Sequence, residues 1–598
     1  MTYEPKDLSA EASPTSGEEA VYSHIPDAPL RVLKFGSSVL RTAADLPRVA
    51  GEIYRQRRAG KRLIVVVSAL AGETDALLGL ACVAGGTGNE DGVADLVSLG
   101  EEKTAALLKL ACGRLGLDAR LLRPEELGIR TSGGGLDADP AFIDLPALAR
   151  RAARHDLLIM PGFVGIDDSG ARALLGRGGS DFTAIFVGGE IGAECVRLYK
   201  DVDGVFDHDP ADGHVARKYD EVSWADCLEV ARPLLQPRSM EYARDKGLRL
   251  EVEAIGSDAP TCVGPVTRPP RPRAGEPRLR VAIAGFGTVG QALLARLRDE
   301  PRFEVVSILV RDPAKPRQPD ATSLLTTSIE DFLGIDADIL VEATSDVGAA
   351  RQLCSAFLGR GRHAVIASKK LAAGHAHELR AMAAGAQRLL HSATVGGATP
   401  ALETAKHARE GGEICEIRAV LNGTVNFVLG ELATGSGFDQ AVASARRAGF
   451  AEADPSEDLS SRDVAAKLQI LAAAGFGPVE RLDLEIEPLD EALAGQVRAG
   501  GQRWLQLATL RREGGSVSGG VRFIPTCLAP DVPPLPREWN FLNIRLADGR
   551  TWIASGRGAG GGPTAEAIIA DLYDIAGDRS RIASPTACAA TEGVRAVA

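Results

Sequence analysis

Apolar runs alternate with amphipathic segments along the chain and divide it into two α/β units. In the first unit, the short run 31–35 predicts a strand, residues 36–38 a turn, and LIVVVSAL at 63–70 a buried strand. Strand-like and helix-like segments alternate from there to about residue 255, which is typical of a layered α/β domain. The pattern restarts at 279–300 with a strand, a glycine turn and an amphipathic helix. Further strands are predicted at 303–311, 337–344 and 363–368, and a last turn and helix at 556–576.

A stretch without this pattern separates the two units. Residues 256–278 contain six prolines and four arginines, and they cannot supply a core. We therefore predict a linker there, semi-rigid where the prolines cluster. The first 30 residues are acidic and predict a disordered tail.

Composition narrows the classes of function. A chain of 598 residues is longer than one core supports, so we expect at least three compact units. With a net charge of −12 and no Lys/Arg-rich block, we expect small-molecule substrates and neither a nucleic acid nor a membrane as partner. The nine cysteines form no CxxC pair, and no long apolar span or signal-peptide core occurs. We expect a cytoplasmic protein.

The glycine turn of the second unit predicts a dinucleotide site. Gly285, Gly287 and Gly290 form G-x-G-x-x-G between a predicted strand and a predicted helix, the context that this pattern requires. The first glycine permits the tight turn, the second lets a pyrophosphate approach the backbone, and the third lets helix and strand pack closely. The helix N-terminus then faces the phosphates. A purely structural turn is the alternative.

Cations near the end of the next strand favour NADP over NAD. An NAD enzyme usually has a carboxylate there for the ribose hydroxyls. Here Arg311 ends the strand, Lys315 and Arg317 follow, and Asp312 comes one residue late. These cations suit a 2′-phosphate, so we predict NADPH as the cofactor; the alternative is that they are solvated loop charges.

A lysine and an aspartate share a helical face in the C-terminal half. Asp463 and Lys467 are four residues apart, a spacing that most often marks a surface ion pair. Carboxylates crowd just before them, and such a cluster beside one lysine suits recognition of an ammonium group while the lysine moves a proton. These carboxylates belong to Glu452, Asp454, Glu457 and Asp458.

The stretch 449–467 resembles the signature of homoserine dehydrogenases, which reads G-[YF]-x-E-x-D-P, several acidic residues and then D-x-x-x-K. The resemblance covers essentially 279–598 in the family's order. It includes IASKKL at 366–371, TVGGATP at 394–400, VLNGTVNFVL at 420–429 and GAGGGPTA at 558–565. It implies reduction of L-aspartate 4-semialdehyde to L-homoserine with hydride from NADPH. An unrelated NADP reductase would not explain residues 449–467.

This resemblance also assigns roles by position. Lys467 matches the lysine that handles the aldehyde or alcohol oxygen, and Lys369 matches a second lysine near the reacting centre. Asp463, also counted as catalytic, and Glu452 match residues that hold the substrate amino group. The other substrate-binding positions are Asp458, Asn422, Gly423 and Thr424. The cofactor-binding positions are Gly285, Phe286, Gly287, Thr288, Val289, Gly290, Arg311, Lys315, Ser368 and Gly562.

Two positions depart from the dehydrogenase pattern. The family often has Asn where this chain has Ser368. A glutamate usually precedes the T-V-G turn and helps bind a monovalent cation, whereas this chain has Ser392. The resemblance therefore implies a monovalent cation site only weakly, at Val395.

The first unit resembles aspartate kinase over roughly 31–255. Five stretches in family order carry the resemblance: KFGSSVL (34–40), SALAGETDALL (68–78), SLGEEKTAALL (98–108), LGRGGSDFTA (175–184) and YKDVDGVFDHDP (199–210). It implies phosphorylation of L-aspartate by ATP with Mg²⁺, in which positioning and charge neutralisation do most of the chemistry.

The kinase resemblance assigns Lys34 to the transferring phosphate and Asp181 to organising Mg²⁺ or Lys34. Arg177 would clamp the aspartate carboxylate, a task suited to a guanidinium, and Glu101 would meet the amino group. Ser38 is a further substrate-binding position. The ATP-binding positions are Lys34, Gly36, Ser37, Lys200, Asp201, Asp203 and Gly204.

Departures in this half leave an alternative open. The glycine turn is one glycine shorter than K-F-G-G-[TS]-S, and Pro233 stands where the family has a lysine near the ATP phosphates, with Arg232 or Arg238 as candidate replacements. The chain is therefore either bifunctional or a dehydrogenase with an inactive kinase-like module for binding or assembly. Bifunctional relatives usually carry paired ACT-type regulatory modules, where threonine acts. The stretch 256–278 has no room for them, so we predict no threonine inhibition through such modules.

The expected fold is α/β in three parts. An amino-acid-kinase α/β/α sandwich spans 31–255. A Rossmann domain spans 279–405 and is completed by 546–598, and an α/β substrate and dimerisation domain spans 406–545. Because the dehydrogenase family generally dimerises, we expect a homodimer or a higher homo-oligomer.

Overall fold

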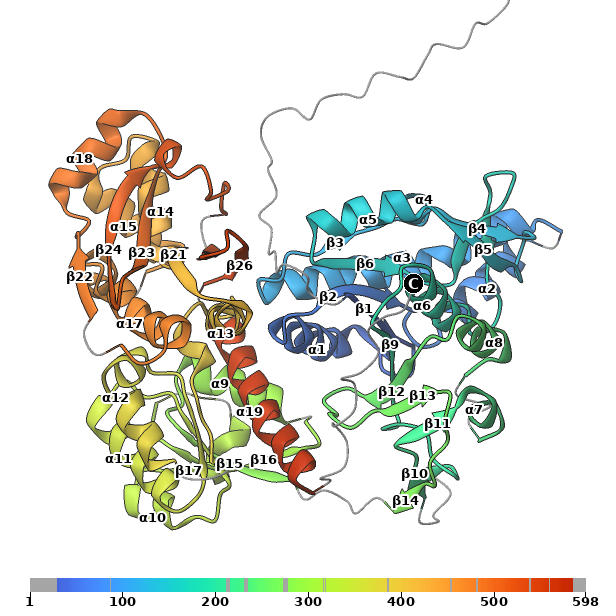
Figure 1. The fold of residues 1–598 in the computed structure, drawn as a ribbon, viewed down its shortest axis with the longest axis horizontal. Helices are drawn as coiled ribbons and strands as arrows, with labels where there is room; N and C mark the ends of the chain where they lie inside the picture. The colour runs from blue at the N-terminus through green and yellow to red at the C-terminus, as the bar shows by residue number, and fades with distance from the viewer. Residues whose placement is uncertain are drawn as a thin grey trace, which may run out of the picture.

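The computed structural model describes residues 30–583 apart from short gaps, and these residues form two halves (Figure 1). The predicted tail lies outside the described residues except for Leu30, which begins the first strand. The gaps are 87, 211–215, 231–234, 273–277, 299, 316, 318, 384–386, 452–453, 480–481, 537–538 and 559.

A largely parallel sheet forms the core of the first half. Its strands are β1 (Leu30–Phe35), β2 (Arg62–Val67), β3 (Arg120–Leu121), β6 (Leu157–Pro161), β9 (Cys195–Lys200), β11 (Glu221–Ser223), β12 (Leu250–Ala254) and β13 (Thr261–Gly264). Their order is β11-β13-β12-β9-β1-β2-β6-β3, and only β12 and β13 are antiparallel. The two strands predicted near residues 31 and 63 are thus confirmed as neighbouring central strands.

Helices cover both faces of this sheet, as the apolar residues on both faces of β1 and β2 require. Val32 and Ile64 pack with α6 (Gly179–Glu190) and α8 (Pro237–Asp245), whereas Leu33 and Phe35 pack with α1 (Leu46–Arg58) and α3 (Glu90–Arg114) on the opposite face. The predicted α/β/α sandwich is therefore confirmed. The other helices of this half are α2 (Glu73–Val83), α4 (Pro124–Leu127), α5 (Leu145–Arg154), α7 (Trp224–Val230) and the 3₁₀ turn η1 (Ala43–Asp45).

Two small sheets complete the first half. Part of the stretch predicted as a linker forms strands of this half. One sheet contains β5 (Asp139–Ile143), β4 (Ile129–Ser132), β7 (Val164–Ile166) and β8 (Arg172–Leu174), and the other pairs β10 (Arg217–Lys218) with β14 (Arg271–Pro272). Both β13 and β14 lie within 256–278. The proline-rich composition hid these strands, because the four residues of β13 are held by pairing with β11 and β12.

The second half contains a parallel sheet with the order of a dinucleotide-binding fold. Its strands are β15 (Leu279–Ala284), β16 (Phe303–Leu309), β17 (Leu325–Thr326), β18 (Ile339–Glu342), β19 (His363–Ile366) and β20 (Leu389–Leu390). They lie in the order β17-β16-β15-β18-β19-β20, which is 3-2-1-4-5-6 in chain order. The helices near this sheet are α9 (Thr288–Leu297), α10 (Ile329–Gly334), α11 (Val347–Gly359), α12 (Lys369–Met382), α19 (Gly561–Ala583), and the 3₁₀ turns η3 (Pro319–Leu324) and η4 (Ser392–Thr394).

A mixed sheet builds the remaining domain. It contains β22 (Leu482–Ile486), β24 (Ser516–Pro525), β23 (Trp504–Glu513), β21 (Ile414–Val420), β25 (Trp539–Leu546) and β26 (Thr551–Arg557) in that spatial order. Its helices are α13 (Ala401–Gly411), α14 (Gly423–Ala433), α15 (Phe438–Arg447), α16 (Ser456–Leu459), α17 (Arg462–Phe476), α18 (Glu491–Gly500) and the 3₁₀ turn η5 (Thr526–Leu528). Because β26 pairs with β25, the return to the dinucleotide domain comes at α19 and not at residue 546.

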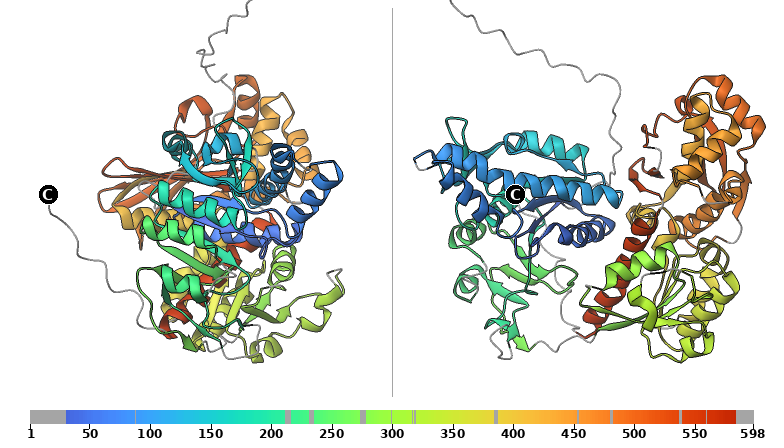
Figure 2. Two further views of the ribbon diagram at one scale, coloured as in Figure 1. Left: turned by 90° about the vertical axis from the view of Figure 1, so that its right-hand side faces the viewer. Right: turned by 180° about the vertical axis from the view of Figure 1, so that it is seen from behind.

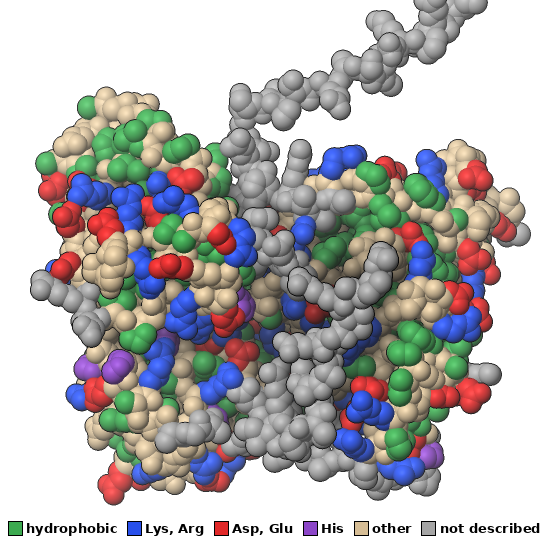
Figure 3. All heavy atoms as spheres, viewed as in Figure 1, with side chains coloured by type: hydrophobic (Ala, Val, Ile, Leu, Met, Phe, Trp, Pro, Cys, Tyr) green, Lys and Arg blue, Asp and Glu red, His purple; other side chains and the backbone are tan. Residues whose placement is uncertain are grey.

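The two halves meet along a helical seam. Figure 1 and the right-hand view of Figure 2 place α19 at the boundary, where it packs on α9 and also contacts α1 of the first half. Acidic and basic side chains are interspersed over both halves on the face shown in Figure 3. No helix among the described residues is long and apolar enough to cross a membrane.

Candidate active sites

The glycine turn after β15 has the close contacts that a dinucleotide turn requires. Gly285 has a φ of 101°, and a Cβ on it would lie 2.3 Å from the carbonyl oxygen of Ala343. A Cβ on Gly290 would lie 2.3 Å from the carbonyl oxygen of Gly285. At Gly287, directly before α9, nothing lies within 4 Å of a Cβ position. The first and third glycines are thus dictated by packing, while the second leaves room for a pyrophosphate.

Exposed cations lie just beyond the neighbouring strand. Arg311 and Lys315 are exposed after β16, and the Arg311 guanidinium donates to Ser345 Oγ at 3.5 Å. Arg317 donates to the carbonyl of Lys315 at 3.1 Å. The strand-end position predicted for recognition of the ribose therefore presents two exposed positive side chains at the edge of the sheet where nucleotides bind.

A buried carboxylate fixes the start of α12 at the same edge. Glu342 ends β18, and its carboxylate accepts from the backbone N–H of Ser368 at 3.3 Å and that of Thr344 at 2.7 Å. Burial raises the pKa of Glu342, and these hydrogen bonds oppose that shift. Ser368 in turn caps α12, accepting from the N–H of Leu371 at 3.4 Å. Lys369, the next residue, thereby begins α12 shortly after β19, the second strand from β15 and its glycine turn.

One aspartate bridges two lysines across the boundary between the dinucleotide and substrate domains. Asp463 Oδ1 lies 2.7 Å from Lys369 Nζ, and its Oδ2 lies 2.6 Å from Lys467 Nζ. Lys467 is buried on α17 and also donates to the carbonyl of Leu421 at 2.6 Å. Burial lowers the pKa of Lys467, with Asp463 opposing and Lys369 adding to the shift. The two lysines outweigh burial at Asp463 and hold its pKa below the usual range.

A second carboxylate lies beside this trio. Asn422 caps α14 by accepting from the N–H of Val425 at 3.0 Å, and its amide donates to Asp458 Oδ1 at 2.9 Å. Burial raises the pKa of Asp458, and the charge of Asp463 adds to that shift. Gly423 begins α14, and Thr424 donates to the carbonyl of Phe450 at 2.6 Å. An ammonium group here would restore the charge balance of Asp458.

The first half has a lysine–aspartate–lysine trio of its own. Asp181, in the first turn of α6, lies 2.6 Å from Lys34 Nζ and 2.8 Å from Lys200 Nζ. Lys34 lies on β1 and Lys200 ends β9, the adjacent parallel strand. All three side chains are buried. Burial opposes ionisation of Asp181, but the two lysines bring its pKa down to about 2.

The turn after β1 lies directly against this trio. A Cβ on Gly36 would lie 2.6 Å from Lys34 Nζ, so the glycine lets the ammonium lie across the turn. Glu101 is buried on α3, and burial raises its pKa, with Lys34 lowering it in part. One oxygen of Glu101 has no hydrogen-bond partner among the described residues. A buried, under-partnered carboxyl group beside a cationic trio is consistent with a site for an ammonium-bearing ligand.

Comparisons with known proteins divide at the same boundary as the structure. Residues 285–392 match the family model of the homoserine dehydrogenase NAD binding domain, and residues 400–573 match that of homoserine dehydrogenase. The chain is 32% identical over 321 residues to the homoserine dehydrogenase of Corynebacterium glutamicum, covering 50% of this chain and 71% of that protein. The chain belongs to the homoserine dehydrogenase family. A solved homoserine dehydrogenase from Thiobacillus denitrificans has 29% identity and a TM-score of 0.45, covering 52% of this chain and 75% of that one.

The first half matches a different family. Residues 29–250 match the amino acid kinase family model. Over 237 residues this half is 35% identical to the aspartokinase of Mycolicibacterium smegmatis. The match covers 39% of this chain and 56% of that protein. The aspartokinase 2 of Bacillus subtilis is 32% identical over 228 residues, again with 56% of its length covered. The chain thus spans little more than half the length of these aspartokinases, and an amino acid kinase domain precedes the dehydrogenase.

The remaining predicted positions are less well defined by contacts. In the dehydrogenase half, Phe286 is buried, Thr288 is exposed and Val289 is half-buried at the start of α9, and Gly562 is exposed at the start of α19. In the kinase half, Ser37, Arg177 and Asp201 are exposed, and Ser38 is half-buried. Asp203 pairs with Lys218 at 3.3 Å, and Gly204 approaches Thr261 closely.

Some predicted positions lie outside the described residues, and Arg238 contacts carboxylates. Glu452, Arg232 and Pro233 lie outside the described residues. Arg238, a candidate replacement for the family's lysine, pairs with Asp137 at 2.8 Å beside the turn at Gly176, and it also pairs with Asp139.

Several site residues were missed from the sequence. Glu342 ends an apolar run, which was its only signal. Ser68 and Ser180, whose hydroxyls lie 2.7 Å apart, join the end of β2 to the start of α6 beside Asp181. Lys200 was expected only as an ATP-binding position, whereas the fold also pairs it with Asp181.

An arginine side chain lies near Val395, where the resemblance weakly implied a monovalent cation site. Val395 is fully buried, and the adjacent turn η4 contacts the guanidinium of Arg58 from the kinase half. Among the described residues, no three His, Cys, Asp or Glu side chains are arranged to hold a metal ion. The positive charge next to this turn is therefore already supplied by Arg58.

Proposed function

We propose that the dehydrogenase half reduces L-aspartate 4-semialdehyde to L-homoserine with NADPH. The observation that carries this proposal is the Lys369–Asp463–Lys467 trio, which joins the two domains of this half at the edge of the sheet where the glycine turn lies. The glycine turn would hold the pyrophosphate, and Arg311 with Lys315 would hold the 2′-phosphate. When bound, the cofactor supplies the hydride.

The chain's own residues then manage binding and the proton. Protonated Lys467 donates a proton to the substrate's carbonyl oxygen as that oxygen becomes the hydroxyl of the alcohol. Asp463 holds the ammonium group of Lys467 in position. The lowered pKa of Lys467 makes this donor a stronger acid than an exposed lysine. Asp458, with Glu452, would bind the substrate ammonium, and Asn422 orients Asp458. Gly423 and Thr424 would line the same pocket.

An assay of the purified full chain tests this activity. Oxidation of NADPH is followed with aspartate semialdehyde, and reduction of NADP⁺ is followed with L-homoserine. Turnover in both directions is expected, with NADPH preferred over NADH. Binding of NADPH without any turnover of the semialdehyde would contradict the proposal.

The same chain is proposed to phosphorylate L-aspartate with ATP and Mg²⁺. The buried trio of Lys34, Asp181 and Lys200 supports it, because two fixed cations beside a glycine turn suit a transferring phosphate. Gly36, Ser37, Asp201, Asp203 and Gly204 would contribute to the ATP site, and Arg177, Glu101 and Ser38 to aspartate binding. No observation on the described residues or in the comparisons favours an inactive module.

Formation of the acyl phosphate is measured by trapping it as a hydroxamate. Signal that depends on L-aspartate, ATP and Mg²⁺ is expected. If ATP binds but no hydroxamate forms above a Lys34→Ala control, the alternative of a binding or assembly module replaces this proposal. Assembly into at least a dimer, a cytoplasmic location and a monovalent cation near Val395 stay predictions.

A further inference from the structure

One guanidinium of the kinase half lies inside the dehydrogenase half. Arg58 is the last residue of α1, and its side chain is only 6% exposed. Its Nη2 contacts Asp571 of α19 and lies 2.9 Å from Ser392 Oγ, 3.3 Å from Glu403 and 3.1 Å from Asp574. All four partners belong to the dehydrogenase half. Separations of 334 and 513 residues along the chain make this a contact that only the assembled halves provide.

The carboxylates around Arg58 require a cation. Asp571 is fully buried and Glu403 nearly so. Burial alone would raise the pKa of Glu403, but Arg58 and then Lys406 bring it down to about 2. Burial also raises the pKa of Asp571, and Arg58 opposes that shift. Without Arg58, Asp571 and Glu403 would lose their strongest compensating cation, so they would take up protons or move apart.

This cluster ties together three segments of the dehydrogenase. The backbone N–H of Ser392 donates to Asp571 Oδ2 at 3.0 Å, and its hydroxyl lies 2.8 Å from Asp571 Oδ1 and 2.5 Å from Glu403 Oε1. Ser392 begins η4, Glu403 lies on α13 and Asp571 lies on α19. Together, η4 and α13 form the connection from the dinucleotide sheet to the substrate sheet. Arg58 therefore holds the connection on which the two domains of the dehydrogenase are aligned.

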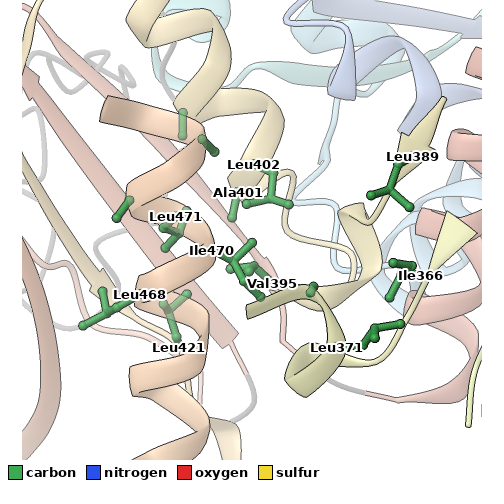
Figure 4. Close-up of a cluster of buried hydrophobic side chains, with 14 of the residues drawn as sticks. Ile366, Leu371, Leu389, Val395, Ala401, Leu402, Leu421, Leu468, Ile470 and Leu471 are labelled. Carbon is green, nitrogen blue, oxygen red and sulfur yellow. The ribbon is translucent and has the colours of Figure 1, made fainter. Parts of the chain in front are cut away.

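Continuous packing links this connection to the proposed proton donor. Val395, directly after η4, lies in the same buried cluster as Leu421 and Leu468 (Figure 4). Leu421 supplies the carbonyl that accepts from Lys467, and Leu468 follows Lys467 on α17. A shift of η4 would therefore change the position of Lys467, because a packed core transmits displacement.

We propose that Arg58, contributed by the kinase domain, is a positioning residue of the dehydrogenase that sets the alignment of its cofactor and substrate domains through Ser392, Glu403 and Asp571. The inference rests on the proposed dehydrogenase activity. It makes the kinase domain a structural part of the dehydrogenase site, whether or not phosphate transfer takes place.

The test compares full-chain variants in the NADPH oxidation assay. Arg58→Ala should lower kcat for semialdehyde reduction by about tenfold or more, because small misplacements of catalytic groups cost rate. NADPH affinity should stay near that of the wild type, since the glycine turn is untouched. Arg58→Lys, which keeps the charge, should be intermediate, and added methylguanidinium should restore part of the rate of Arg58→Ala but not of the wild type.

A neighbouring arginine provides the matched control. Arg57 is also buried at the end of α1, but its ion pair, at 2.9 Å, is with Asp156 of the kinase half. Arg57→Ala should leave dehydrogenase kcat near that of the wild type. If Arg58→Ala does not fold, Asp571→Asn, which keeps the shape and removes the charge, should show the same loss of kcat at unchanged NADPH affinity.

The outcomes separate this inference from the proposed function. Wild-type-like kcat in Arg58→Ala, or equal losses in the Arg57 and Arg58 variants, would overturn the role of Arg58 while the proposed reaction stands. Loss of kcat without rescue by methylguanidinium or by Arg58→Lys would also overturn it, since such a loss reflects general damage. An inactive wild type that still binds NADPH would overturn the proposed reaction and the inference together.

Discussion

The two halves of the molecule carry the same charge arrangement in different surroundings. In each half an aspartate bridges two lysines, at 2.6 and 2.8 Å in the kinase half and at 2.7 and 2.6 Å in the dehydrogenase half. Each trio has one net positive charge when all three groups are ionised. The difference lies in which elements supply the side chains.

The kinase trio is built within one domain. Its lysines come from adjacent parallel strands and its aspartate from the helix packed on them, and all three side chains are at most 10% exposed. In the dehydrogenase trio, Asp463 and Lys467 share α17, but Lys369 belongs to the dinucleotide domain and is 44% exposed. One trio is thus fixed by a single sheet, while the other is completed only when two domains meet.

This contrast matches the chemistry proposed for each half. Phosphate transfer needs permanent positive charge at a fixed place, which a buried, single-domain trio supplies. Carbonyl reduction needs a proton that leaves the protein and is replaced; the proposed donor Lys467 is buried, and Lys369 is the member of its trio that reaches solvent. The predictions that follow change residues of the two trios and, in one case, a cation of the cofactor site.

The largest effect is expected at Lys467. Lys467→Ala should lower semialdehyde reduction by about 10²- to 10⁴-fold, because the proton donor is lost, while Lys369 still neutralises Asp463 and keeps the fold. NADPH oxidation is measured together with NADPH affinity, which should not change. Turnover like that of the wild type would reduce Lys467 to an ion-pair partner and move the proton to Lys369 or to water.

Lys34 should matter about as much to phosphorylation of L-aspartate as Lys467 does to semialdehyde reduction, and it should not affect semialdehyde reduction. Lys34→Ala should lower hydroxamate formation by about 10²- to 10³-fold, since charge stabilisation of the transferring phosphate is removed. Lys34→Arg serves as the charge-preserving control. Semialdehyde reduction by the same preparation should be unchanged, and a parallel loss of both activities would show that the trios are not independent.

The exposed cations of the cofactor site should show a smaller effect. Arg311→Ala should raise KM for NADPH by about tenfold, the value expected for one charge-assisted contact, and should leave KM for NADH unchanged. Arg351→Ala, a surface arginine paired with Glu378 on the same domain, is the control. An equal loss for both cofactors would argue against recognition of the 2′-phosphate by Arg311.

The smallest effect is a shift in pH dependence. Because Lys467 must be protonated to donate, the rate of reduction should be constant below its pKa and fall as the pH rises through it. Burial and Lys369 both lower that pKa, so Lys369→Ala should move the falling limb to higher pH, by up to about one unit. Lys370→Ala, an exposed neighbour 3.7 Å from Glu457, should leave the limb in place. A shift to lower pH in Lys369→Ala would contradict the coupling of the two lysines.

Local patterns determined much of this protein from the sequence. Runs rich in apolar residues located the central strands of both parallel sheets, because strands covered on both faces have few polar positions; Lys34 on β1 and Lys200 on β9 are exceptions that belong to the site. The i to i+4 spacing placed Asp463 and Lys467 on one face, and glycines marked the turn that close backbone approach requires. A strand pattern, however, reports only the residues of the strand itself. The sequence therefore did not predict β13, because its surroundings are rich in proline and its pairing partners lie elsewhere in the chain.

Contacts between distant segments were decided only by the tertiary structure. Lys369 and Asp463 are 94 residues apart, and Arg58 and Asp571 are 513 apart, so no periodicity connects them. Nothing in the local sequence of α1 distinguishes Arg58, which reaches the dehydrogenase, from Arg57, which stays in the kinase half. The packing of α1 against α19 makes that choice, because a buried guanidinium must lie where carboxylates are already assembled.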